Sequence, residues 1–138
     1  MEERGMNERV RMLRRQSVET IDMVITLHAC DTATDYALNT AVQRGAKYIL
    51  SVPCCQHELA GKADYAAMPI FDDNGILRER VSALITDSLR QTLLTACGYR
   101  TGLMEFVDLS HTPQNLLLRA KKTKLPERTR RSALKTHE

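Results

Sequence analysis

The sequence lacks the features that mark membrane and secreted proteins. No run of apolar residues reaches the roughly 18 that a membrane-spanning helix needs. The N-terminus is charged from Glu2 onward and has no apolar segment of the kind that directs secretion. The four cysteines, including the adjacent pair Cys54 and Cys55, do not follow the spacing of a secreted disulfide framework. We therefore expect a cytoplasmic protein with reduced thiols and no membrane contact.

The chain is long enough for one domain, and its charge is uneven along that length. Residues 119–138 hold eight Lys or Arg against two Glu, whereas the preceding residues hold twelve basic and fifteen acidic side chains. No aromatic residue lies among the final basic ones, so stacking on nucleobases by this segment is not expected. We predict a polar segment with a weak helical pattern over 1–20, a folded domain over 21–120 and a loose basic tail over 121–138.

The first half of the predicted domain alternates strand and helix signals. Two runs rich in β-branched residues, Met23–Leu27 and Tyr48–Val52, have the composition of buried strands. A helix is expected between them, beginning at the capping-box pair Thr32 and Asp35 and ending at Gly45. Strand, helix and strand in this order predict a βαβ unit with parallel strands.

The second half predicts a long helix over Ile76–Cys97 and then two strands, Gly102–Val107 and Leu116–Ala120. The connection between these strands is too short for a crossover helix, so they should pair antiparallel. The helix has an apolar stripe that we expect to be core, made of Leu77, Val81, Leu84, Ile85, Leu89, Leu93 and Ala96. The predicted class is therefore α/β, in the order β-α-β-α-β-β, with an antiparallel strand at the end of an open sheet.

Polar clusters follow the first two predicted strands, His28–Asp31 after one and Pro53–Glu58 after the other. Ligands of open α/β sheets bind beyond the carboxyl ends of the parallel strands, so both clusters should face one crevice. One interpretation is a group-transfer site, in which Asp31 or His28 accepts a proton from the reacting group or orients it.

Three other interpretations of the same residues stay open. A zinc site would draw on His28, Cys30, Cys54, Cys55 and His57, although no CxxC or HxxxH spacing is present. A helix N-terminus after Cys54 and Cys55 could make one of them a reactive thiol. Asp31, Thr32 and Asp35 could serve only as helix caps.

Two long stretches resemble a known family. They are VITLHACDTATD at 24–35 and LSVPCCQHEL at 50–59. Both resemble class I methyltransferases that use S-adenosylmethionine, namely a bacterial group and the domain of eukaryotic proteins with a glutathione-transferase-like C-terminal region. A more distant resemblance is to tRNA ribose 2′-O-methyltransferases. Residues 105–120 are similar to the last hairpin of the bacterial members, and the resemblance covers about 21–120.

The resemblance implies the C-terminal half of a Rossmann-like methyltransferase sheet, with the present strands as the fourth to seventh. The family's glycine-rich cofactor turn has no counterpart in this sequence, where six glycines are scattered. The chain is thus expected to be a fragment that is inactive unless the half that holds S-adenosylmethionine is supplied. The implied roles are catalytic for His28, Asp31 and Asp35, cofactor-binding for Cys30 and Thr32, and substrate-binding for Pro53, Cys54, Cys55, Gln56 and His57, with no metal.

Two kinds of partner are expected. RNA is the expected methyl acceptor, on the distant resemblance and the basic tail. Self-association is expected through the edge of the Met23–Leu27 strand, because an unpaired strand edge invites pairing with another chain. The alternative function is a non-catalytic module that binds nucleic acid or a partner chain through its basic tail.

Overall fold

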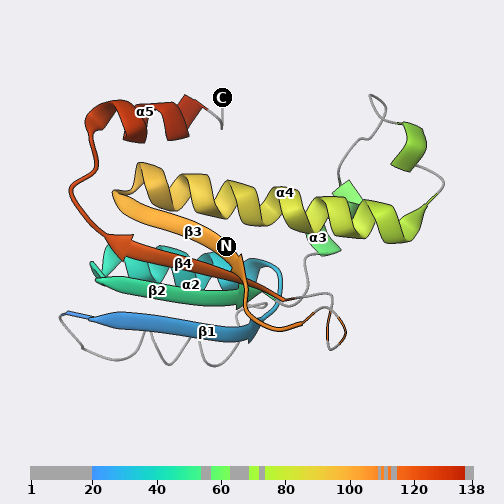
Figure 1. Cartoon of the computed structure of the whole chain (residues 1–138), viewed down its shortest axis with the longest axis horizontal. Helices are drawn as coiled ribbons and strands as arrows, with labels where there is room; N and C mark the ends of the chain where they lie inside the picture. Colours follow the sequence, from blue (N-terminus) through green and yellow to red (C-terminus); the bar gives the residue numbers. More distant parts are fainter. Residues whose placement is uncertain are drawn as a thin grey trace, which may run out of the picture.

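The computed structural model describes residues 20–53, 57–62, 69–71, 74–108, 110, 112 and 115–135. These residues form a mixed α/β fold around a four-stranded sheet of order β1-β2-β4-β3 (Figure 1). The elements in chain order are β1 (Met23–Ala29), α2 (Thr32–Gln43), β2 (Tyr48–Pro53), α3 (His57–Lys62), the 3-10 helix η1 (Pro69–Phe71), α4 (Gly75–Ala96), β3 (Tyr99–Glu105), β4 (Leu116–Lys122) and α5 (Glu127–Lys135). The helix expected within 1–20 lies outside the described residues, apart from Thr20.

The predicted βαβ unit is confirmed, with β1 and β2 paired in parallel from Met23↔Tyr48 onward. Gly45 follows α2 with φ +69, the left-handed conformation that suits glycine after a helix. The capping box is not formed, however. Thr32 is the first residue of the helix, Asp31 is its N-cap, and the Asp31 side chain makes no capping hydrogen bond. Asp35 binds elsewhere, as described below.

The last two strands are antiparallel, as their short connection predicted, from Tyr99↔Lys122 to Glu105↔Leu116. We expected the antiparallel strand at the end of the sheet, but β4 lies between β2 and β3 and is antiparallel to both. Residue Asn115 shapes the connection. Its side-chain amide donates to the Val107 carbonyl at 3.0 Å, and its own carbonyl accepts from the Phe106 amide at 3.1 Å.

Helix α4 begins directly after Asn74, whose side chain accepts a hydrogen bond from the Leu77 amide. The expectation that its apolar stripe is core is wrong for much of the stripe. Leu77, Leu84, Ile85 and Leu93 are exposed, while α4 buries Ser82, Asp87, Arg90, Leu94 and Ala96. The reason is that the side of the helix that meets its neighbours is partly polar, with the buried ion pair of Arg90 and Asp87 on the same side as Leu94.

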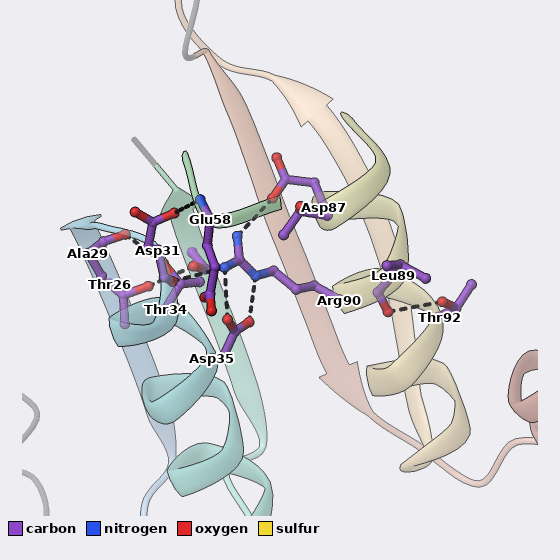
Figure 2. A network of polar contacts seen from close by, with 12 residues as sticks. Thr26, Ala29, Asp31, Thr34, Asp35, Glu58, Asp87, Leu89, Arg90 and Thr92 are labelled. Atoms are coloured by element: carbon purple, nitrogen blue, oxygen red, sulfur yellow. Dashed lines mark hydrogen bonds and ion pairs between the residues drawn. The ribbon is translucent and has the colours of Figure 1, made fainter. Parts of the chain in front are cut away.

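One core cluster lies between the helices and one face of the sheet. Strand residues Val24, Ile49 and Leu118 point into it, and Leu38 of α2 and Leu94 of α4 cover them. Since Arg90 of α4 also contacts α2 directly, both helices lie on the same side of the sheet (Figure 2). The Tyr99 side chain closes the cluster, with its hydroxyl donating to the Ala46 carbonyl at 2.8 Å.

The structure differs from the loose tail expected after Ala120. Strand β4 continues to Lys122, and α5 then packs along α4 (Figure 1). Arg130 fixes the packing by donating from Nε to the Ala96 carbonyl at the end of α4, at 2.9 Å. Ala133 is the one residue of α5 that is buried. A polar segment is thus ordered by a few specific contacts instead of a broad apolar face.

Within the part of the chain that the structure describes, the opposite face of the sheet has little cover along β1. Its side chains alternate, so Val24 and Thr26 are buried toward the helices while Met23, Ile25 and Leu27 are about half exposed or more. We call this side the open face. It carries the exposed apolar residues Met23, Ile25, Leu27 and Tyr48 and the exposed basic residues Arg100, Arg119 and Lys121, which the strand register places in adjoining rows, and Met104 near the end of β3.

Candidate functional site

The carboxyl end of β1 departs from regular strand geometry. The pairing with β2 runs Leu27↔Val52 and then Ala29↔Pro53, so His28 is left out of the ladder as a bulge. His28 has φ 56, and Asp31 has φ 45 with ψ −125. Positive φ is uncommon outside glycine, and such positions cost on the order of 1–3 kcal/mol each. Two strained residues therefore flank Ala29 and Cys30.

Three hydrogen bonds, two from α2 and one from α4, hold this turn in place. The buried Thr34 hydroxyl of α2 donates to the Ala29 carbonyl at 2.6 Å. The Ala33 amide donates to the Cys30 carbonyl at 3.0 Å, within the first turn of α2. From α4, Arg90 Nη2 donates to the Asp31 carbonyl at 3.0 Å. The strained backbone is thus stabilised by its surroundings, as a persistent high-energy conformation requires.

Arg90 is the centre of the network in Figure 2, and its side chain is 4% exposed. It binds Asp35 of α2 through two bonds, from Nε to Oδ1 at 2.7 Å and from Nη2 to Oδ2 at 3.1 Å. Its Nη1 donates to the equally buried Asp87 of α4 at 3.2 Å. One guanidinium therefore joins α4 to α2 and to the turn after β1, in the fork geometry that arginine supplies.

The Arg90 guanidinium stays protonated although it is buried. Desolvation lowers the pKa of the guanidinium, but the hydrogen bonds and charges of Asp35 and then Asp87 outweigh it, so the pKa of Arg90 lies above its ordinary value. Two carboxylates and a backbone carbonyl thus surround a permanently charged group. Loss of Arg90 would leave the buried Asp87 carboxylate without this partner.

The end of β2 is brought to the same place through α3. The Glu58 amide in the first turn of α3 donates to Asp31 Oδ1 at 3.3 Å. On its other side α3 is tied to α4, because Arg78 Nη2 donates to the Ala60 carbonyl at 3.3 Å. The structure therefore brings the beginning of α3 beside Asp31, as neighbouring parallel strands predict.

The candidate residues differ in how they are placed. His28, Cys30 and Thr32 are exposed, Asp31 is half-buried, and Pro53 is buried at the end of β2. Asp35 is half exposed, with both carboxylate oxygens engaged by Arg90. Cys54, Cys55 and Gln56 lie outside the described residues, and His57 is described only as the first residue of α3.

The sequence did not point to several residues that build this site. Arg90 and Asp87 lie more than 50 positions from Asp35 and Asp31 along the chain. They belong to a helix whose apolar pattern predicted that other residues would be buried. Thr26 of β1 and Ser51 of β2 form a buried hydroxyl pair at 2.7 Å, on the helix-covered side of the two strands. A charged pair spaced i, i+3 within an apolar helix was the available signal for Asp87 and Arg90.

The zinc and thiol interpretations concern the cysteine and histidine side chains at the ends of β1 and β2. Within the described ranges, no group of three or more His, Cys, Asp or Glu side chains is placed to hold a metal ion. Cys30 and Cys97 are exposed, and neither is part of a disulfide. The zinc and thiol interpretations both depend on Cys54 and Cys55, which lie outside those ranges.

Comparison with known proteins gives one match. Residues 1–62, less than half of the chain, match the sequence model of a family described as a methyltransferase domain. The matched part contains β1, α2, β2 and α3, and hence the strained turn. Neither the curated proteins nor the solved structures gave a match. The family match supports a methyltransferase domain in this chain and a general role in methyl transfer. No helix among the described residues is long and apolar enough to cross a membrane.

Proposed function

We propose that this chain supplies one wall of an S-adenosylmethionine-dependent methyltransferase site at the carboxyl ends of β1 and β2. The observation that carries the proposal is the strained turn His28–Asp31, held by Arg90 within the segment that matches a methyltransferase domain. Strain of this kind concentrates at functional sites, and the ends of parallel strands are where open α/β sheets bind ligands.

The residues of the turn fit a cationic ligand. S-adenosylmethionine brings a methyl group activated on a positively charged sulfur. Asp31 is half-buried and receives one backbone hydrogen bond, from Glu58, which leaves carboxylate lone pairs for another donor or a cation. Cys30 and Thr32, both exposed beside it, are the proposed cofactor contacts. With no glycine-rich turn in the sequence, we propose weak cofactor binding and no methylation by the chain alone.

The three acidic or basic candidates take different roles. Asp31 orients the acceptor and accepts the proton of its reacting O–H or N–H group. His28, exposed on the bulge, is the second proton acceptor. Asp35 is a positioning residue, because its two oxygens hold Arg90, which in turn holds the Asp31 carbonyl. Pro53, Cys54, Cys55, Gln56 and His57 are proposed to border the acceptor.

The acceptor that we propose is RNA, supported by the excess of basic side chains after Leu118. Two of these residues already have partners, because Arg130 binds the end of α4 and Arg131 pairs with Glu127. A purely tail-driven binder of nucleic acid is the alternative function. It would lose affinity steeply with salt and be indifferent to changes at Asp31.

The test is a titration of isotope-labelled protein with S-adenosylmethionine, followed through backbone amide chemical shifts. The amide chemical shifts of Cys30, Asp31 and Glu58 should change with ligand concentration until they saturate. Asp31→Asn should weaken the binding. Asp22→Asn is the matched control, since Asp22 is an exposed carboxylate paired with Lys47 at 2.7 Å. If the three amides stay unmoved at millimolar ligand in a folded protein, the proposed site is wrong.

A further inference from the structure

The open face has an apolar half along β1 and the start of β2 and a basic half along β4 and the start of β3, and Met104 is exposed beyond the basic half at the other end of β3. Met23, Ile25, Leu27 and Tyr48 expose 47%, 58%, 55% and 40% of their surfaces along β1 and the start of β2. Lys121 lies beside Tyr48 in the strand register, and Arg100 lies beside Lys121. Arg119 occupies the next row, opposite Gly102. Four adjacent exposed apolar side chains are more than the scattered ones that a monomer surface normally shows.

The basic half lacks anionic partners within the described chain. No ion pair joins Arg100, Arg119 or Lys121 to an acidic residue there, and Lys121 instead lies 5.6 Å from the centroid of the Tyr48 ring. The Arg119 side chain extends over Gly102, so close that a β-carbon at residue 102 would lie 3.3 Å from its Nε. Three cations are thus displayed on one surface at the border of an apolar strip.

The geometry of the sheet favours a helix as the covering element. Parallel strands are normally covered on both faces, and in α/β folds the covering layer is helical. Here α2 and α4 cover one face only. Neighbouring strands lie about 4.8 Å apart. A helix about 10 Å across would therefore span β1 and β2 and bring the side chains on one of its edges over β4.

Two other occupants fit less well. A second copy packed face to face about a two-fold axis would set the basic half against either the basic or the apolar half of its partner. Nucleic acid would satisfy Arg100, Arg119 and Lys121 but would leave Met23, Ile25 and Leu27 in water. An amphipathic helix with carboxylates along one edge matches both halves.

We propose that the open face is the docking surface for an amphipathic helix of a partner polypeptide, with its apolar stripe on β1 and β2 and its acidic edge over Lys121, Arg119 and Arg100. Docking buries Ile25 and Leu27, and it pairs the three cations. The interaction involves the face opposite α2 and the Arg90 network, and it does not depend on methyl transfer.

The test uses two synthetic helical peptides with the same leucine stripe, one with glutamates along one edge and one with lysines there. Binding to the full chain is followed by fluorescence anisotropy. The glutamate peptide should bind saturably with one peptide per chain, and Ile25→Asn should weaken it about tenfold. Leu84→Asn is the matched control, since Leu84 is 55% exposed on α4 against 58% for Ile25. Arg119→Glu with Lys121→Glu should reverse the preference between peptides, whereas Lys135→Glu on α5 should not.

Four results would overturn the proposal. The first is absent binding of the glutamate peptide, or equal binding of both peptides. The second is an equal loss in Leu84→Asn and Ile25→Asn. The third concerns the protein without peptide: Lys121, but not Lys135, becomes protected from acetylation as the protein concentration rises. That result would show that a second copy of the chain covers the open face. The fourth is that single-stranded oligouridylate displaces the glutamate peptide from the wild type but not from the Tyr48→Ala variant. That result would assign the open face to RNA.

Discussion

The two faces of the sheet are built from the same strands but are completed differently. On the helix-covered face, Ile49 and Leu118 are fully buried and Tyr99 is nearly so. On the open face, Ile25 and Leu27 of the same β1 strand are more than half exposed. Alternation along a strand assigns a residue to a face, but only the neighbouring elements decide whether that face is buried. Stability should therefore depend on one face and interaction on the other.

The largest difference between the faces should appear on truncating their apolar residues. Leu118→Ala removes a fully buried side chain from the core, and should lower the free energy of unfolding by about 3 kcal/mol. Ile25→Ala should lower it by about 0.5 kcal/mol, because most of that side chain already contacts water. Urea denaturation followed by circular dichroism measures both. Equal losses would mean that the open face is covered in solution.

The Arg90 network is the polar counterpart of that core. Arg90→Ala should lower the free energy of unfolding by about 2–3 kcal/mol, since it removes the cation that faces the buried Asp87 carboxylate, while the half-exposed Asp35 is rehydrated. It should also release the Asp31 carbonyl and weaken S-adenosylmethionine binding. Arg131→Ala, which breaks the exposed pair with Glu127, is the control and should cost about 0.5 kcal/mol or less. Similar losses in the two variants would contradict a structural role for Arg90.

These residues also show how far the sequence could be interpreted. The strands, the parallel pairing of β1 with β2 and the long helix follow from local composition and periodicity, which act within a few residues. The buried side of α4 does not follow, because periodicity finds an amphipathic helix without revealing what lies against it. Here Ser82 and Arg90 are buried while Leu84 is exposed.

The candidate site was predictable to the same extent. Strand ends located Asp31 and the beginning of α3, because the rule that places ligands there depends only on topology. The backbone strain at His28 and Asp31 was not visible, nor was the contact with Arg90, which joins residues 59 positions apart. Helix α5 was missed because the segment is polar and Ala133 is its one buried residue, while Arg130 attaches it to the end of α4 by a hydrogen bond that local composition does not reveal.

Tyr99 offers a smaller and pH-dependent test of the covered face. Burial raises the pKa of its phenol, and its hydroxyl donates to the Ala46 carbonyl. A raised pKa in the folded state means that the stabilisation is complete below the ordinary pKa of about 10 and is lost as pH rises through the folded value. Tyr99→Phe should cost about 1 kcal/mol at neutral pH. In denaturation measured at several pH values, the stability of the variant should decline less above pH 10 than that of the wild type. Parallel declines would show that the Tyr99 phenol does not cause the loss of stability at high pH.

The smallest effect on folding is expected at the free edge of β1, where we propose that the chain self-associates. The run Met23–Leu27 has no charged residue, and β1 has a strand partner on one side only within the described sheet. Antiparallel pairing of two such edges would align the apolar side chains of both copies on one continuous face and leave that face open to the helix.

Ile25→Lys places a charge on this edge, as natural edge strands often do. The free energy of unfolding should change by no more than about 0.5 kcal/mol. Association measured by sedimentation over a range of protein concentrations should weaken, whereas Leu84→Lys on α4 should leave it unchanged. Association that survives Ile25→Lys but not Leu84→Lys would move the self-contact from the strand edge to the exposed stripe of α4.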